Sequence, residues 1–244
     1  MNRVELTSVE GLPEVRPGDD LASLIAERAG LNQGDVLVVA QKVVSKAEGR
    51  MVRLEDVTAG EEARRIAPRL IANPDPRMVQ VVLDESVRVL RAERVLITET
   101  RHGYVSANAG VDHSNVGSGF LTLLPIDPDA SARALRTRLK ELKGVDVGVI
   151  VSDTFGRPWR LGIVNVALGV AGIAAVNDLR GTQDDMGEPL HATVIAVADE
   201  IAAAAGLVMR KTARTPAVIV RGLSAGGEGA GRDLIRPAGE DLFR

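Results

Sequence analysis

The 244-residue sequence contains no cysteine, only 2% aromatic residues and a small net charge of −3. Without cysteine there can be no disulfide, no thiolate zinc site and no cysteine nucleophile. With so few aromatic rings and no excess of positive charge, the chain has little to stack on bases or to attract phosphates. We therefore expect no nucleic-acid partner. The N-terminus lacks the apolar core of a signal peptide, and the apolar stretch at 193–209 is interrupted by Asp199 and Glu200. We therefore expect a cytoplasmic protein with no membrane partner.

Hydrophobic residues make up 45% of the chain, which indicates a folded globule of one large or two small domains. Short β-branched runs predict buried strands at 36–40, 79–83, 95–98, 147–151 and 217–220. Apolar spacing and capping residues predict helices at 19–29, at 58–70 with Thr58 as N-cap, from Asp129 to Gly144, and at 190–209. Glycines and prolines predict loops at 101–119, 153–162, 180–189 and 222–239.

This mixture of elements indicates an α/β or α+β architecture without a clean βαβ rhythm. The composition changes after Gly156, and we expect a second lobe at about 157–209 within a single unit of 1–244.

The segment NAGVDHSN at 108–115 offers hard oxygen ligands for Mg²⁺ or Mn²⁺. Asp112 and Asn115 can reach one point across a tight turn, and the neighbouring glycines let the backbone approach a ligand. The alternative is an Asx turn, in which the Asp112 carboxylate only caps its own backbone. His113 has no second histidine at ligand spacing, so we expect no metal bond from it.

The segment VSDTFGRPWRLG at 151–162 follows a predicted strand and places Asp153 and Thr154 at its end. A strand-end carboxylate beside a hydroxyl is typical of Mg²⁺ sites in nucleotide enzymes, although a single strand-end aspartate can also be a helix cap. Arg157 and Arg160 follow closely and can hold phosphate or carboxylate groups with two hydrogen bonds each. The combination favours a functional site.

The segment GDVLVVAQKVVSKAEGR at 34–50 has a predicted strand that ends at Gln41 and Lys42, with Ser45 and Lys46 beyond it. Lysines at such a sheet edge can bind an anionic ligand, but they can equally be a solvated strand end. The chain has neither the GxxxxGK[ST] pattern nor a GxGxxG that opens a helix after a strand. A nucleotide would need another kind of cradle.

Together with ADEIAAAAGLVM and PAVIVRGL, these segments occur in an order and spacing that closely resemble the coenzyme F420-0:L-glutamate ligase family, the gamma-glutamyl ligases of the deazaflavin coenzyme. The resemblance covers nearly the whole chain. It implies a two-lobed α+β subunit in an intertwined homodimer. It also implies that GTP phosphorylates the carboxylate of the lactyl-phosphate tail of F420-0, and that the amine of L-glutamate then attacks the acyl phosphate.

Family membership does not fix the acceptor. A gamma-glutamyl ligase acting on another acid, such as a folate-like pterin, is therefore an alternative, and a non-catalytic nucleotide- or metal-binding homologue is another. The number of glutamates added also stays open.

The resemblance also implies roles for individual residues. Asp112 and Asp153 resemble ligands of a first divalent cation, Mg²⁺ or Mn²⁺, and Thr154 resembles a ligand of a second, with K⁺ as a further candidate ion. We expect Asp112, Asp153 and Arg157 to be catalytic. The positions that resemble nucleotide contacts are Leu12, Pro13, Glu14, Val15, Gln41, Lys42, Lys46 and Asn115.

One segment departs from the family pattern. Where some relatives have a glycine- and acid-rich loop around the nucleotide phosphates, this chain has Arg210, Lys211 and Thr212, followed by Ala213 and Arg214. Lys211 stands where an acid helps to hold the second metal. A protonated lysine cannot bind a metal ion but can neutralise phosphate. We therefore expect Arg210, Lys211 and Thr212 to contact the nucleotide.

Overall fold

The computed structural model describes residues 3–71, 73–210 and 214–241. Its strands are β1 (Glu5–Ser8), β2 (Val36–Ala40), β3 (Met51–Arg53), β4 (Ser86–Glu93), β5 (Val95–Thr100), β6 (Val105–Ala107), β7 (Phe120–Thr122), β8 (Gly148–Arg157), β9 (Arg160–Ala171), β10 (Asn177–Asp178), β11 (Val194–Ile195) and β12 (Ala217–Arg221). Its α-helices are α1 (Leu21–Ala26), α2 (Gln41–Ala47), α3 (Glu61–Ile66), α4 (Pro76–Asp84), α5 (Pro128–Lys143) and α6 (Val197–Met209). The fold is therefore mixed α/β, as the sequence predicts.

A five-stranded sheet with the order β1-β12-β2-β8-β9 forms the centre of the molecule. Only β2 and β8 are parallel; the other neighbours run antiparallel. Strand β2 has the predicted bounds. Its side chains alternate between the two faces of the sheet, and because both faces are buried, every residue of the strand is apolar. Leu37 and Val39 join one hydrophobic cluster, and Val36 and Val38 join the other.

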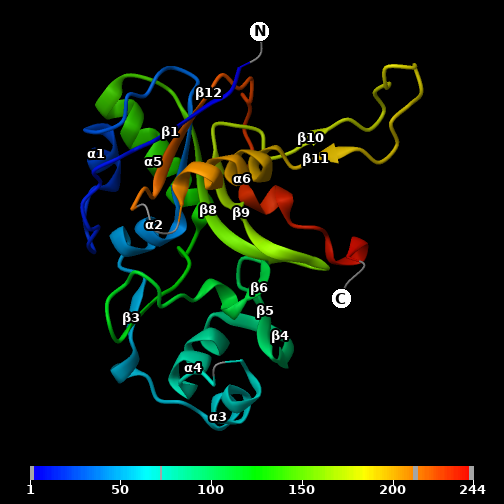
Figure 1. The fold of residues 1–244 in the computed structure, drawn as a ribbon. Helices are drawn as coiled ribbons and strands as arrows, with labels where there is room; N and C mark the ends of the chain where they lie inside the picture. The colour runs from blue at the N-terminus through cyan, green and yellow to red at the C-terminus, as the bar shows by residue number, and fades with distance from the viewer. Residues whose placement is uncertain (1–2, 72, 211–213, 242–244) are drawn as a thin grey trace.

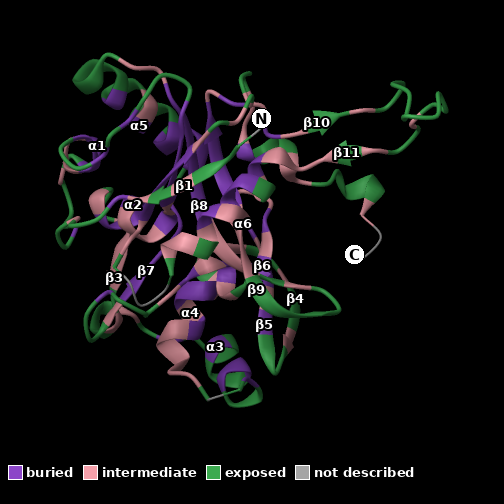
Figure 2. Cartoon of the chain, turned by 45° about the horizontal axis from the view of Figure 1, so that its top comes forward, coloured by how far each residue is buried: buried purple, intermediate pink, exposed green. Residues whose placement is uncertain are grey.

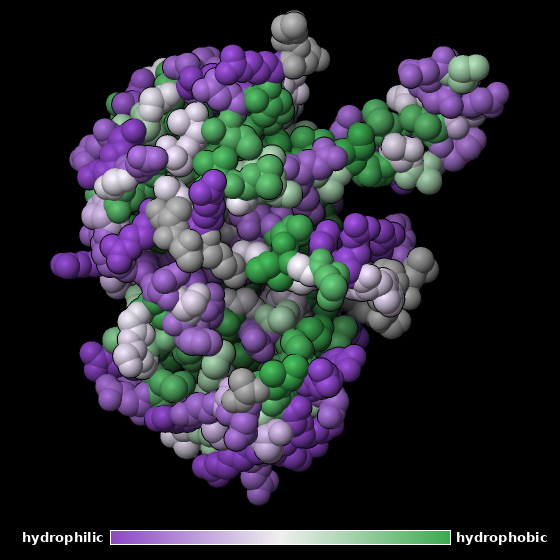
Figure 3. Space-filling view, viewed as in Figure 1, coloured by the Kyte–Doolittle hydropathy of each residue, from purple (hydrophilic) through white to green (hydrophobic). Residues whose placement is uncertain are grey.

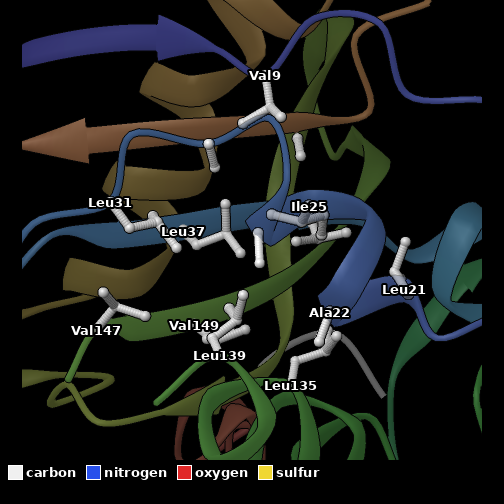
Figure 4. Packing of buried hydrophobic residues seen from close by; sticks show 14 of the residues in the cluster. Val9, Leu21, Ala22, Ile25, Leu31, Leu37, Leu135, Leu139, Val147 and Val149 are labelled. Atoms are coloured by element: carbon white, nitrogen blue, oxygen red, sulfur yellow. The ribbon is translucent and has the colours of Figure 1, made fainter. Parts of the chain in front are cut away.

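Helices cover both faces of this sheet (Figure 1). Helices α1 and α5 pack on the first cluster, where Ile25 and Leu139 meet Leu37 and Val149 (Figure 4). Helix α6 packs on the second cluster through Ile201 and the alanines of its buried face, which include Ala198. In Figure 2 the buried residues gather in this layer of strands.

Helix α5 begins two residues earlier than predicted. Asp127 is its N-cap and accepts a hydrogen bond from Ala130 N at 2.9 Å, and Gly144 ends it in the left-handed conformation with φ 69°. Asp129, the predicted cap, is buried and instead accepts hydrogen bonds from the backbone N–H groups of Val170 at 2.9 Å and Gly231 at 2.6 Å. Asp129 thus ties β9 to the C-terminal segment.

A second core lies in residues 52–123, below the central sheet in Figure 1. It packs helices α3 and α4 against the β4-β5-β6 sheet and the β3-β7 pair. The region 157–209 contributes β9 and α6 to the central sheet and its cover, and most of its buried residues pack in the cluster beneath α6, while Leu168 packs with Tyr104 and Leu124.

Four other predicted elements differ in the structure. Residues 79–83 lie in helix α4 and not in a strand, because Asp75 caps the helix through Arg77 N at 2.9 Å and Pro76 occupies its first position. The predicted loop at 153–162 is a strand hairpin of β8 and β9. The helix predicted at 190–209 begins only at Val197, and that at 58–70 is shortened to α3 with Gly60 as N-cap.

The pair β10-β11 forms an arm, residues 177–195, that stands clear of the rest of the molecule (Figures 1 and 3). Met186 near its end is 87% exposed. Across the part of the chain that the structure describes, no helix combines the length and apolar character needed to cross a bilayer.

Candidate functional site

The predicted site segments meet where β2 and β8 separate. Ala40, the last residue of β2, pairs with Ser152 of β8. Beyond this pair, Gln41 starts helix α2 and Asp153 continues along β8. The two sequence-predicted segments are therefore neighbours, although more than a hundred residues separate them in the chain.

Lys42 joins this point to the 108–115 segment. Its ammonium donates hydrogen bonds to Asp112 Oδ2, to the Ser114 carbonyl and to Ser114 Oγ, each at 2.7 Å. A lysine has three donors, and all three are directed at this one turn. Lys42 thus lies just beyond the end of β2, as predicted, in the first turn of helix α2, and it is ion-paired rather than simply solvated.

The carboxylate of Asp112 is held in its charged form. Burial acts to raise the pKa of Asp112, but the hydrogen bonds from Lys42 and Ser114 and the charge of Lys42 outweigh burial and lower the pKa below its ordinary value. Ser114 N donates to Asp112 Oδ1 at 2.7 Å, so the Asx turn considered from the sequence is formed as well. The turn fixes the direction of this carboxylate.

Lys46 lies one helical turn further along α2. Its ammonium donates to the carbonyl of Asn115 at 2.7 Å and pairs with Glu14. Gln41 is buried, and its Oε1 accepts a hydrogen bond from Ser45 Oγ at 2.8 Å. The structure therefore brings Glu14, Lys42, Lys46, Asp112 and Asn115 together, whereas Gln41 is buried within the fold.

Asp153 and Thr154 point to opposite faces of the sheet, because successive residues of a strand alternate and the register from Asp153 to Gly156 is regular. Thr154 lies on the α6 side, where its Oγ1 and Asn165 Oδ1 are 3.3 Å apart and Asn165 Nδ2 contacts Met209 Sδ at 3.6 Å. Asp153 lies on the other side, the side of the α1 and α5 cluster. Neither caps a helix, because β8 continues to Arg157.

Arg157 lies at the turn of the β8-β9 hairpin. Its Nη2 donates to the Leu161 carbonyl at 2.7 Å, while its buried Nε has no hydrogen-bond partner among the described residues. Arg160 starts β9 and is exposed. The structure leaves both arginines at the hairpin end and does not bring them to the Lys42–Asp112 pair.

A cavity of about 630 Å³ lies beside the N-terminal segment. Leu12 and Arg210, both sequence-predicted, line it. The remaining lining residues come from β1, the loop after it, the end of α6 and the basic loop that follows, and none of them was predicted individually as a nucleotide contact: Ser8, Glu10, Gly11, Leu207, Val208, Arg214 and Thr215.

The other predicted nucleotide contacts differ in their surroundings. Val15 is buried in the main core, whereas Pro13 is exposed. Lys211 and Thr212 lie outside the described residues, and so does Ala213.

The donor set fits a divalent cation only in part. Carboxylate and hydroxyl oxygens are the ligands that Mg²⁺ and Mn²⁺ prefer. Within residues 3–71, 73–210 and 214–241, however, no three acidic, histidine or cysteine side chains gather as a ready metal cluster. A cation on Asp112 or Asp153 would therefore depend on water and substrate oxygens for its remaining ligands, as Mg²⁺ often does.

Fold and site together define a mixed α/β protein with lysines and carboxylates gathered where two parallel strands separate, an arrangement suited to phosphate-bearing ligands. Residues 11–222 match the F420-0:gamma-glutamyl ligase family, and the chain belongs to this family. The resemblance found in the sequence is confirmed.

Full-length relatives agree with this assignment. The chain is 49% identical to a coenzyme F420:L-glutamate ligase of Methanopyrus kandleri, over 95% of this chain and 94% of the relative. It is 49% identical to the protein of the same name from Archaeoglobus fulgidus, over 99% and 97%. A third such ligase, from Haloarcula marismortui, is 46% identical over 99% and 96%.

Proposed function

We propose that this protein is a GTP-dependent coenzyme F420:L-glutamate ligase that joins the amino group of L-glutamate to the tail carboxylate of F420-0. The observation that carries the proposal is the convergence of Lys42, Lys46, Asp112 and Asp153 at the β2–β8 junction, in a chain of this family. Positive groups for phosphate and carboxylates for Mg²⁺ or Mn²⁺ are what a phosphoryl-transfer site requires.

The reaction has two steps. In the first, a carboxylate oxygen of the acceptor attacks the γ-phosphorus of GTP, the bond to the β-phosphate oxygen breaks, and GDP leaves. In the second, the glutamate amine attacks the acyl carbon, phosphate leaves, and the amine loses a proton as the amide forms. A divalent cation, when bound, would neutralise charge on the transferring phosphoryl group.

The chain's residues mainly position these partners. Leu12 lines the 630 Å³ cavity and Glu14 contacts Lys46, so the segment between them links the cavity to the lysines. We assign the nucleoside of GTP to this cavity, beside Arg210, and its phosphates to Lys46 and Lys42. We assign Asp112 and Asp153 as the cation ligands.

Thr154 lies on the face of the sheet opposite to Asp153. A Thr154 ligand would therefore belong to a separate cation on the α6 side, near Arg210. K⁺ is a further candidate ion there, and Arg157 would reach the reaction only if the hairpin end moves toward it.

We also propose that two copies assemble as an intertwined homodimer. A two-stranded ribbon such as the β10-β11 arm is marginal alone in water, and it needs a surface to pack on. The tip of the β8-β9 hairpin is similarly exposed, with Trp159 at 82% and Leu161 at 98%. A second copy would cover both.

The proposed function is tested by incubating the protein with F420-0, L-glutamate, GTP and Mg²⁺ or Mn²⁺ and measuring glutamylated product by mass spectrometry. GDP should appear in step with product, and omission of either F420-0 or glutamate should suppress product formation. Product from a folate-like acceptor alone would instead identify a gamma-glutamyl ligase of different specificity. Nucleotide binding without any product would indicate a non-catalytic homologue.

A further inference from the structure

A second cavity, of about 340 Å³, lies where the β8-β9 hairpin meets the 52–123 part and the C-terminal segment. Its walls are largely apolar and include Leu90, Tyr104, Phe155, Val166 and Ile235. The rings of Tyr104 and Phe155 meet edge to face at 80°, and the Tyr104 hydroxyl is anchored on the Leu168 carbonyl. Its volume is within the range of small-molecule sites.

The cavity shares a sheet face with Asp153. Asp153 pairs directly with Val166, and Phe155 lies two residues further along β8, so the three side chains project to the same side. Two residues of a strand span about 7 Å. The cavity wall thus begins within one side-chain length of the proposed reaction centre.

Three charged side chains add polarity to the cavity: Asp199, Arg236 and Asp241. Asp199, in the first turn of α6, lines it and accepts a hydrogen bond from Ala167 N at 2.8 Å through one carboxylate oxygen. Burial raises the pKa of Asp199 above its ordinary value. A group of this kind can form a directed hydrogen bond with a polar ring edge.

We propose that this cavity binds the planar deazaflavin ring of the acceptor, so that the acidic tail runs along β8 to Asp153. The inference rests on the proposed function. Of the three substrates, GTP carries a polyphosphate and glutamate is small and charged, so neither matches a cavity whose walls are mainly apolar and include two aromatic rings. A flat ring with polar edges matches both the apolar walls and Asp199.

The test fills the cavity. Leu90→Trp introduces a large ring at a lining position on β4 that is already 36% exposed. Val87→Trp is the matched control, because Val87 is an exposed residue of the same strand that does not line the cavity. We expect Leu90→Trp to raise the Kd for F420-0 at least tenfold in equilibrium dialysis, with the GTP Kd changed less than twofold, and Val87→Trp to change neither.

A second measurement uses the single tryptophan of the wild-type chain. Trp159 follows Pro158, which lines the cavity, so F420-0 should quench Trp159 emission in the absence of GTP. Asp199→Asn, which keeps an acceptor for Ala167 N, should weaken F420-0 binding about tenfold, the usual worth of a hydrogen bond to a charged group. Unchanged F420-0 affinity in both Leu90→Trp and Asp199→Asn would overturn the ring site while wild-type turnover persists. Loss of the proposed function itself would show differently, as wild-type protein that makes no product.

Discussion

Lys42 is ion-paired with Asp112, a carboxylate that we assign to a divalent cation. Replacing Lys42 with an uncharged residue should therefore tighten metal binding in the absence of nucleotide. The ammonium makes three 2.7 Å contacts with Asp112 and Ser114. Fully buried contacts of this kind contribute about 1.5–3 kcal/mol each, whereas exposed ion pairs contribute about 0–1 kcal/mol.

The side chains of Lys42 and Asp112 are 19% and 38% exposed, so screening by water reduces the total. We take about 1–2 kcal/mol for the whole arrangement, between the two limits. A cation that binds Asp112 must displace the ammonium or accept its repulsion at this cost. Lys42→Met removes the cost, so the affinity for Mn²⁺ should rise by about 5- to 30-fold.

The assay is titration of nucleotide-free protein with Mn²⁺, followed by calorimetry or by the electron paramagnetic resonance signal of free Mn²⁺. Lys140→Met is the matched control. Lys140 also pairs with an aspartate, Asp146, at 3.1 Å, but it lies on helix α5 and outside the proposed site. This variant should leave Mn²⁺ affinity unchanged. The reasoning is refuted if folded Lys42→Met protein binds Mn²⁺ no more tightly than wild type.

Three further predictions follow from other parts of the structure. Asp153→Asn should lower glutamate-dependent GTP turnover at least 100-fold while circular dichroism stays unchanged; near-normal turnover would remove Asp153 from the site. Asp35→Asn should lower the free energy of unfolding by about 2 kcal/mol at pH 7, less than a fully buried pair because Arg221 is 41% exposed. Burial acts to raise the pKa of Asp35, but the hydrogen bonds from Arg221 and Asn32 N and the charge of Arg221 lower this pKa below its ordinary value. The stability is therefore present above about pH 4 and is lost as the pH falls through the folded pKa. In urea unfolding, the gap between the two proteins should narrow as the pH falls below about 4, and a gap that widens would contradict the sign. Gly169→Ala should cost about 3 kcal/mol or more, because the new Cβ would lie 2.0 Å from the Pro128 carbonyl oxygen, whereas Gly156→Ala, with open space around it, should cost less than about 0.5 kcal/mol by the same unfolding assay.

Elements whose bounds depend on residues inside or next to them are predicted correctly from the sequence. Strand β2 is predicted correctly because its run of valines and leucine is buried on both faces. Helix α5 is predicted to within two residues because Gly144 ends it in the left-handed conformation. Residues 79–83 mislead because a β-branched run in a short amphipathic helix looks like a strand, and only Asp75 and Pro76 before it indicate otherwise.

The site follows the same division. The sequence supplies the chemistry of Asp112 and Asp153, because aspartates among hydroxyls and glycines carry a local signal. It does not supply the contact between Lys42 and Asp112, which are 70 residues apart and meet only through tertiary packing. The opposite orientation of Thr154 was also hidden, because it depends on β8 continuing as a regular strand through Arg157.

The most direct test of the central claim compares wild-type and Asp153→Asn protein in one reaction with F420-0, L-glutamate, GTP and Mg²⁺, read by mass spectrometry. The account predicts that wild type adds one or more glutamyl residues to F420-0 with matching release of GDP, and that the variant adds none. Absence of glutamylated F420-0 with folded wild-type protein, or equal product from both proteins, would contradict it.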